Sequence, residues 1–281
     1  MIALFQALVL GIVQGVTAWI PVSSKTQVIL FANYFYNINF MEALSFALLV
    51  HTGDLIATFY LFRKEIAGFV AIKPRLDDLK AMESADPERS LFWFVVISVI
   101  FSGLVGLPLF LATKKGFSDL PGTLFLAIVG VILVVLGLIM WRSSRQSQNQ
   151  AEGREKKRIS LMDTILAGCA QGLSVVPGVS RSGITESLLL LRGYAPYEAV
   201  RLSFFMSLPM ILLSILTFFT MEGFGTITLS VAVIGIVAAF IASIITMRVM
   251  LTAAEKVKFY YFNIAIGLIA ILPFAYQIFS Q

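Results

Sequence analysis

Long uncharged runs are the feature of this 281-residue chain that most limits its fold. Six of them are long enough to cross the hydrocarbon core of a bilayer, which takes about 20 residues. They cover residues 1–24, 91–113, 120–141, 202–221, 223–247 and 259–281. The stretch 43–62 is also long enough, although it contains His51 and Asp54. The chain is 58% hydrophobic and only 13% charged, about half the charge of a soluble domain, so we predict an all-α polytopic membrane protein.

Two further observations narrow the class of protein. The first run does not have the pattern of a signal peptide, because no basic residue precedes Lys25 and because it contains Gln6 and Gln14. The sequence has one cysteine, Cys169, which excludes an intramolecular disulfide and any metal site built from several cysteines.

Two stretches of similar sequence lie 157 residues apart, measured from Gln14 to Gln171. Residues 14–26 read QGVTAWIPVSSKT, and residues 171–183 read QGLSVVPGVSRSG. Both contain Gln-Gly, an apolar residue and Thr or Ser, followed by a proline and a Ser-rich turn. The offset is about half the chain, which favours an internal duplication. Chance similarity between short apolar segments is the alternative.

Each copy contains a proline, Pro21 or Pro177, at which an apolar helical stretch is expected to end. The apolar stretches that follow, near 26–36 and 184–192, are too short to cross a bilayer. We therefore predict two re-entrant helical hairpins, which are tolerated at membrane depth only where they pack inside protein or line a wet cavity.

The remaining apolar stretches predict six transmembrane helices, near residues 42–62, 92–112, 121–141, 198–219, 228–249 and 259–279. The loops then fall on two sides, and one side carries 17 of the 21 Lys and Arg residues. That side is predicted to be cytoplasmic, which leaves both termini external. Because the positive charge is explained by these loops, nucleic acid is not an expected partner.

The two hairpins enter from opposite sides in this topology, which is the signature of an inverted-topology repeat. We expect a single membrane domain over residues 1–281, with a first repeat at 1–142 and a second at 161–281. Residues 143–160 form a polar, charged linker between them, predicted to be cytoplasmic.

The two Ser-rich turns carry groups that favour an oxyanion. They hold hydroxyls, a guanidinium, an ammonium and a glycine that lets backbone approach closely. The residues are Ser23, Ser24, Lys25 and Thr26 in the first turn and Ser180, Arg181, Ser182, Gly183 and Thr185 in the second. The positive end of the following short helix adds to the field, and the planar fork of Arg181 suits phosphate.

Structural roles are the alternatives for these charged and polar residues. Arg181 would then pair with a buried carboxylate, either Glu186 or Asp54, and Lys25 would extend to the outer surface. His51 and Asp54 share a helix face, and His51 would be a hydrogen-bonded core residue. No spacing of ligands predicts a metal ion.

The two stretches resemble motifs of the undecaprenyl-diphosphate phosphatase family, the integral-membrane bacitracin-resistance type. PGVSRSGIT at 177–185 is similar to the family signature P-G-x-S-R-S-G-x-T without departure. QGVTAWIPVSS at 14–24 resembles [EQ]-G-x-T-E-[FW]-[LI]-P-[VI]-S-S. The run HTGDLIATFYLFRKE at 51–65 is similar to a His-Leu-Gly-Thr segment seen in many members.

The resemblance implies an enzyme that removes the terminal phosphate of a C55-type polyprenyl diphosphate and releases the carrier lipid monophosphate. It implies Ser24 as nucleophile and Arg181 as phosphate clamp, with His51 a further catalytic candidate. Phosphate contacts are implied for Gln14, Ser23, Lys25, Thr26, Gln27, Ser180, Ser182, Gly183 and Thr185. The resemblance also allows a divalent cation, Mg²⁺ or Ca²⁺, and a homodimer in the cell membrane.

Two departures bear on catalysis. Ala18 stands where the family has a glutamate, and Thr26-Gln27 stands where it has Gly-His. Three explanations are open: an engineered change at Ala18, chemistry carried by His51, Asp54 or Lys25, or loss of hydrolysis. In the last case the protein would bind or translocate a polyprenyl phosphate, since a fold alone does not fix function.

Overall fold

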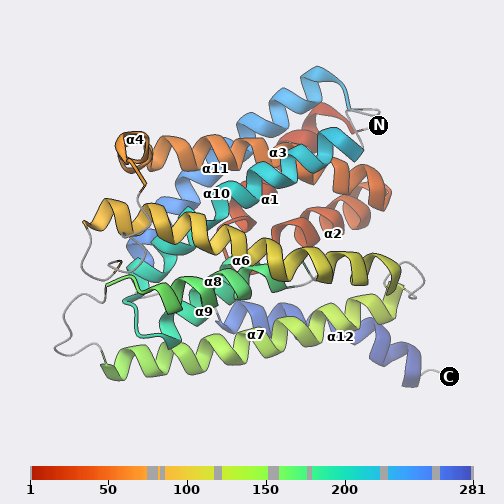
Figure 1. Ribbon diagram of the computed structural model, residues 1–281. Helices are drawn as coiled ribbons and strands as arrows, with labels where there is room; N and C mark the ends of the chain where they lie inside the picture. The colour runs from red at the N-terminus through yellow and green to blue at the C-terminus, as the bar shows by residue number, and fades with distance from the viewer. Residues whose placement is uncertain are drawn as a thin grey trace. The chain divides into compact units, whose positions relative to one another are not determined.

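All regular elements in the described part of the chain are helices, as predicted. The computed structural model describes residues 2–74, 82, 86–116, 122–150, 158–175, 179–221, 227–254 and 260–279. The helices are α1 (Leu4–Thr17), α2 (Ser24–Tyr36), α3 (Phe40–Leu61), α4 (Arg63–Ala71), α6 (Pro87–Gly116), α7 (Gly122–Gln150), α8 (Leu161–Leu173), α9 (Arg181–Leu191), α10 (Pro196–Met221), α11 (Leu229–Ala253) and α12 (Tyr260–Phe279) (Figure 1).

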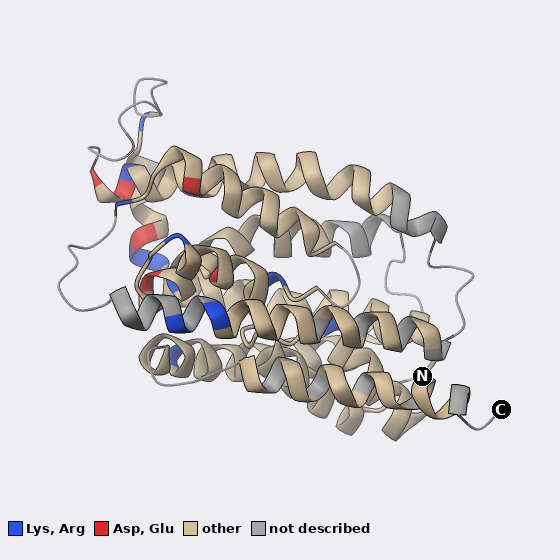
Figure 2. Ribbon diagram, turned by 90° about the horizontal axis from the view of Figure 1, so that it is seen from below, with Lys and Arg blue, Asp and Glu red and all other residues tan. Residues whose placement is uncertain are grey.

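Four helices are long and apolar enough to cross a membrane. They are α3, residues Pro87–Leu111 of α6, residues Pro196–Leu216 of α10, and α11. The other two predicted spans fall in α7 and α12, where the apolar stretches found among the described residues are shorter. In Figure 2 the long helices are coloured tan over most of their described length, because they contain few Lys, Arg, Asp or Glu residues there. The protein is therefore a polytopic helical membrane protein, and the count of six spans stays a prediction.

Both Ser-rich motifs interrupt a helix where the sequence predicts a break. α1 ends at Thr17 and α2 begins at Ser24, with Pro21 between them. α8 ends at Leu173 and α9 begins at Arg181, and Pro177 between them lies outside the described residues. These four helices have 11 to 14 residues, or about 21 Å at most, which is shorter than the roughly 30 Å hydrocarbon core. We call α1–α2 and α8–α9 the two broken pairs.

The helices form two compact units that interleave in sequence. Unit 1 consists of Met1–Lys73 and Phe204–Ala253, and unit 2 of Pro74–Ser203 and Ala254–Gln281. Each unit thus contains one broken pair together with helices from both halves of the sequence. The units do not coincide with the predicted repeats at 1–142 and 161–281, and α7 continues as a helix through Gln150 into the predicted linker.

In unit 1, glycines bring α1 and α3 against α11. A Cβ atom on Gly15 would lie 2.4 Å from the carbonyl oxygen of Ala239, and one on Gly53 would lie 2.4 Å from that of Ile236. Small residues that let helix backbones approach are the usual basis of packing within membranes. The core beside these contacts is apolar and fully buried, with Leu10 of α1 and Phe46 of α3 among its members.

In unit 2, a second pair of glycines brings α8 against α6. A Cβ atom on Gly168 would lie 2.6 Å from the carbonyl oxygen of Ser98, and one on Gly172 would lie 2.9 Å from that of Ser102. Gly168 and Gly172 follow Gly11 and Gly15 by the same 157 residues that separate the motifs. The two broken pairs therefore pack by the same device, each against a long helix from the other half of the sequence.

Candidate active site

The break between α1 and α2 presents two serines at a helix start. Ser23 has φ 60°, ψ 81°, a left-handed conformation that is uncommon for a residue with a side chain. Strained backbone of this kind persists where the surrounding structure holds it, often at functional sites. Ser23 Oγ lies 3.1 Å from Thr26 Oγ1, and Gln27 Nε2 donates to the carbonyl oxygen of Val22 at 3.1 Å. Thr26 and Gln27 thus hold the turn that presents Ser24.

A buried polar cluster lies beside this turn. Gln14 is fully buried, and its Nε2 donates to Asp54 Oδ2 at 2.8 Å and to Ser24 Oγ at 3.4 Å. His51 Nδ1 lies 2.7 Å from both Gln14 Nε2 and Asp54 Oδ2. Ser243 Oγ donates to Asp54 Oδ1 at 2.6 Å. We name these five residues the Gln14 cluster.

Local sequence explains how the Gln14 cluster forms. His51 and Asp54 are three residues apart in α3, so their side chains share a helix face. Gly15 and Gly53 flank the cluster and let α1 and α3 both approach α11, which brings Ser243 into reach. His51 is 4% exposed and Asp54 0%, so both are polar groups that need the partners they have.

Ala18 lies one helical turn beyond Gln14 and is buried. Its N–H donates to the carbonyl oxygen of Gln14 at 2.8 Å, at the end of α1. The next residue, Trp19, is fully buried and packs edge-on against Phe204, with ring centroids 4.8 Å apart. Position 18 thus adjoins the cluster and supplies no polar side chain to it. Lys25 is half-buried in the first turn of α2.

The break between α8 and α9 ends in a capped helix start. Ser180 is the N-cap residue of α9, and its Oγ accepts from the N–H of Gly183 at 3.3 Å and lies 3.3 Å from Ser182 Oγ. Arg181 is half-buried in the first turn. A helix N-terminus carries partial positive charge, so this turn joins a guanidinium to an anion-favouring backbone.

Thr185 and Gly183 have structural partners in the α9 turn and, for Thr185, also in α10. Thr185 Oγ1 lies 2.7 Å from Ser203 Oγ and donates to the carbonyl oxygen of Arg181 at 2.9 Å. The N–H of Gly183 is taken by the Ser180 cap. Both residues therefore stabilise the turn that carries Arg181.

Neither carboxylate considered as a structural partner of Arg181, Glu186 or Asp54, pairs with it within the described residues. Glu186 is 3% exposed, its Oε1 has no hydrogen-bond partner, and no ion pair joins it to Arg181 within the described part of the chain. Asp54 belongs to the Gln14 cluster. Ser24 and Arg181 belong to different units, so their meeting at one site stays a prediction.

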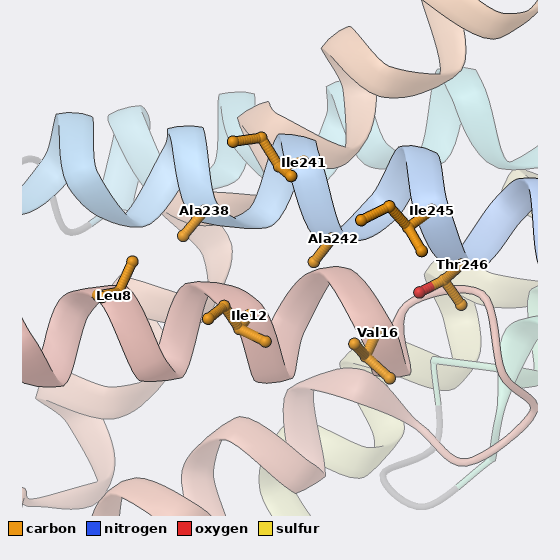
Figure 3. Close-up of a pocket in the computed structure, with 8 residues that line it drawn as sticks. All are labelled: Leu8, Ile12, Val16, Ala238, Ile241, Ala242, Ile245 and Thr246. Carbon is orange, nitrogen blue, oxygen red and sulfur yellow. The ribbon is translucent and has the colours of Figure 1, made fainter.

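An apolar groove follows the contact between α1 and α11 in unit 1 (Figure 3). Its volume is about 320 Å³. It is lined by Leu8, Ile12 and Val16 of α1 and by Ala238, Ile241, Ala242, Ile245 and Thr246 of α11. Val16 stands next to the last residue of α1, so the groove ends where the chain enters the first break.

Within the described residues, no three His, Cys, Asp or Glu side chains gather closely enough to hold a metal ion. His51 and Asp54 form a pair, and both are held by the hydrogen bonds of the Gln14 cluster. The sequence marks His51 as a candidate, but it gives no sign of Ser243, which lies in an uncharged run 189 residues from Asp54.

The fold and these turns define a class: a polytopic helical membrane protein in which one helix break carries a serine that contacts a buried Gln–His–Asp cluster and a second break carries an arginine at a helix start. Comparison with known proteins gives the family. The family described as "Bacitracin resistance protein BacA" matches residues 7–272, and the chain belongs to it. The motif resemblance is thereby confirmed.

Several relatives named undecaprenyl-diphosphatase are similar over nearly their whole length. A protein of Methanococcoides burtonii is 33% identical over 274 residues, 97% of this chain and 98% of its own. One of Saccharolobus solfataricus is 36% identical over 271 residues, 94% and 93% of the two chains. One of Methanothrix thermoacetophila is 31% identical over 270 residues, 95% of each.

Proposed function

We propose that this protein is an undecaprenyl-diphosphate phosphatase of the cell membrane. It removes the terminal phosphate of the lipid diphosphate, releasing inorganic phosphate and the monophosphate carrier lipid for reuse in envelope biogenesis. Such recycling underlies resistance to antibiotics that sequester the diphosphate form. The observation that carries the proposal is the contact of Ser24 Oγ with Gln14 Nε2, beside the buried His51–Asp54 pair, in a chain of this family.

Ser24 is the proposed nucleophile. Its Oγ forms a bond to the terminal phosphorus while the bond from that phosphorus to the bridging oxygen breaks, and the hydroxyl proton goes to the lipid monophosphate that leaves. Water then cleaves the phosphoserine, adding its hydroxide to the phosphorus and its proton to the serine oxygen. The Gln14 amide, which donates to Ser24 Oγ at 3.4 Å, orients that oxygen for attack.

Arg181 is the proposed clamp for the non-bridging phosphate oxygens. Its fork can donate two parallel hydrogen bonds, and the first turn of α9 adds the positive end of a helix. Ser180 and Ser182 add hydroxyls to this turn, and Ser23, Lys25 and Thr26 are the proposed contacts from the first turn.

We further propose the inverted repeat with six spans, two re-entrant pairs and external termini. Reciprocal packing supports it: α1 of the first half contacts α11 of the second, and α8 of the second contacts α6 of the first. Single cysteines at Ser147 and Ser280 in a Cys169→Ser background should react with an impermeant reagent from opposite sides. Labelling of both cysteines from the same side would contradict the inverted topology.

The groove along α1 and α11 is the proposed place of the prenyl chain. It is apolar throughout and ends beside the first break, so a chain lying in it would lead its diphosphate to Ser24. Because the groove is open, it also lets the lipid enter sideways from the bilayer.

We propose that a divalent cation, if present, binds together with the diphosphate substrate. The described residues do not form a dedicated site, since no third ligand joins His51 and Asp54. Mg²⁺ or Ca²⁺ would be held mainly by diphosphate oxygens and water, as is usual for Mg²⁺ bound with phosphates. A homodimer is an untested further proposal that no step of the reaction requires.

Phosphate release from undecaprenyl diphosphate by the purified protein tests the function. We expect release that falls roughly 10³-fold or more in Ser24→Ala, because a nucleophile is lost. Ser230→Ala, a change of the same kind at an exposed serine that contacts Thr228, should leave the rate unchanged.

Flipping of a polyprenyl phosphate without hydrolysis is the alternative. Vesicles with a labelled lipid in one leaflet distinguish the two functions. Protein-dependent transfer between leaflets, with no phosphate freed from the diphosphate under any cation condition, would replace hydrolysis by transport.

A further inference from the structure

Two arginines at the end of α7 take no part in the proposed reaction. The uncharged run at 120–141 ends with Trp141, and Arg142 and Arg145 follow it. All three side chains are exposed, and the Arg145 guanidinium carbon lies 4.4 Å from the centroid of the Trp141 ring. No ion pair joins either arginine to a carboxylate within the described residues. The point at which α7 leaves its apolar run therefore presents an exposed positive surface.

The start of α12 lies beside this end of α7 in unit 2. A Cβ atom on Gly137, one helical turn before Trp141, would lie 3.1 Å from the carbonyl oxygen of Tyr260, the first residue of α12. The rings of Tyr260 and Tyr261 have centroids 4.4 Å apart, and Tyr261 is 61% exposed. Tryptophan and tyrosine gather where a membrane meets water, because their rings are apolar and carry one polar group. We therefore expect these two helix ends at the membrane surface, with the arginines next to the rings.

The surrounding sequence does not balance this positive charge. Neither α7 nor α12 contains an Asp or a Glu. Beyond them, residues 151–158 have four Lys or Arg against two Glu, and residues 255–258 have two Lys against one Glu. The balancing negative charge must then come from outside the chain, and at a membrane surface the abundant anions are lipid headgroups.

We infer that the end of α7, together with the start of α12, binds the headgroup of an anionic phospholipid of the bilayer. Arg142 and Arg145 pair with its phosphate, and Trp141 contacts the lipid where the headgroup meets the acyl chains. The face of the Arg145 guanidinium lies on the Trp141 ring, which leaves the N–H groups at its edge able to donate to a phosphate. The inference does not depend on the phosphatase function, because none of these residues belongs to either Ser-rich turn.

A second stacked arginine, Arg63, provides a contrast and a control. Its guanidinium carbon lies 5.0 Å from the centroid of the Tyr60 ring in unit 1. Its Nη1 donates to the carbonyl oxygen of Tyr60 at 2.8 Å, and Glu65 lies in the same first turn of α4. Arg63 thus has a backbone acceptor and a nearby carboxylate, which Arg145 lacks among the described residues. We expect Arg63 to contribute nothing to recognition of a lipid at Trp141.

The fluorescence of Trp141 tests the inference. Trp19→Phe with Trp93→Phe leaves Trp141 as the single tryptophan, and this protein is reconstituted in phosphatidylcholine bilayers. Phosphatidylglycerol or phosphatidylcholine with brominated chains is added, and quenching gives the relative association of the two lipids at Trp141. We expect phosphatidylglycerol to associate at least about 5-fold more strongly, since each basic side chain near the surface contributes roughly that factor. Arg145→Gln should lower this preference about 5-fold, and Arg63→Gln should leave it unchanged.

Unlabelled competitors identify the source of the phosphate. Phosphatidylglycerol without bromine should reverse the quenching, whereas inorganic phosphate in the buffer should not. Undecaprenyl phosphate should reverse it no better than phosphatidylglycerol at the same mole fraction. Reversal by inorganic phosphate, or by undecaprenyl phosphate at a much lower mole fraction, would overturn the inference, because the surface would then bind free phosphate or the carrier lipid of the proposed reaction.

Equal association of the two brominated lipids, or an unchanged preference in Arg145→Gln, also overturns the inference, since the lipid at Trp141 would then be ordinary boundary lipid. If the single-tryptophan protein does not fold, thermal unfolding of the otherwise unchanged chain decides. Phosphatidylglycerol should raise its Tm above the value in phosphatidylcholine, and Arg145→Gln should lose part of that increase while Arg63→Gln keeps it. An equal increase in Arg145→Gln and in the parent chain would contradict the lipid site.

Discussion

The two broken pairs have the same helix contacts, but different residues surround the buried glutamine in each. In unit 1, Gln14 lies among a histidine, an aspartate and the serine at the start of α2. In unit 2, Gln171 occupies the equivalent position, and its single donated side-chain bond among the described residues goes to Ser102 Oγ at 2.9 Å. Ser102 in turn donates to the carbonyl oxygens of Gly168 and Ser98. Both glutamines are fully buried beside a helix contact made by two glycines.

The different surroundings of Gln14 and Gln171 suggest that the two similar breaks have different roles in the proposed reaction. The polar groups around Gln171 are neutral: its Nε2 donates to Ser102 Oγ, and its Oε1 has no partner among the described residues. Those around Gln14 include two ionisable side chains, which are costly to bury unless they are paired or used. The arginine belongs to the second motif: Arg181 occupies the position there that Ser24 occupies in the first. We propose that the first break carries the groups that attack the phosphate and that the second carries the positive charge that binds it.

The sharpest test of this comparison is the same substitution at both glutamines. Gln14→Leu should lower kcat for phosphate release about 10²-fold, because the amide that contacts Ser24 and Asp54 is lost. Gln171→Leu should stay within about three-fold of the parent, because Ser102 keeps its backbone acceptors. The two rates are measured at saturating lipid, with thermal unfolding as the control. Equal losses at both positions would mean that the two breaks share one role.

A smaller effect is expected at the cation. Arg181→Lys keeps the charge but loses the planar fork, and we expect affinity for the lipid diphosphate to fall about 10-fold. Arg201→Lys is a matched control, since Arg201 pairs with Glu198 within α10. Direct binding measurements check the prediction, and unchanged affinity in Arg181→Lys would remove the phosphate clamp from unit 2.

The smallest effect concerns the groove. Ile245→Trp should raise KM for undecaprenyl diphosphate about 5-fold and leave KM for a short-chain prenyl diphosphate nearly unchanged, because it fills the groove without touching the break. Ile100→Trp in α6 is the control, since Ile100 is 54% exposed and Ile245 59%. Equal changes for long and short lipids would place the prenyl chain elsewhere.

Much of this arrangement could be predicted from local sequence. Pro21 and the Ser-rich turn after it predict where α1 ends, and the uncharged runs predict the long helices, because both signals depend on neighbours in the chain. Contacts between segments far apart in the chain could not be predicted from the sequence. Ser243 meets Asp54 across 189 residues, and nothing distinguishes it from other serines in apolar runs.

The sequence also did not predict that each unit combines two separate ranges of the chain. The sequence predicts a single membrane domain with two repeats but not which helices pack together, and each broken pair here packs on a helix of the opposite half. The repeated Gly-x-x-x-Gly at Gly11–Gly15 and Gly168–Gly172 was a signal for this, since such glycines mark close helix contacts. It shows which helices pack closely but does not show their partners.

The proposed phosphatase site requires that the two Ser-rich turns bind one diphosphate between them. Cysteines at the equivalent positions, Ser24→Cys and Arg181→Cys in a Cys169→Ser background, test it most directly. We expect a short bifunctional thiol reagent to join the two, and undecaprenyl diphosphate to protect them in the corresponding single-cysteine proteins. If each cysteine reacts alone but the pair is never joined, the two turns do not form one site, and the claim is contradicted.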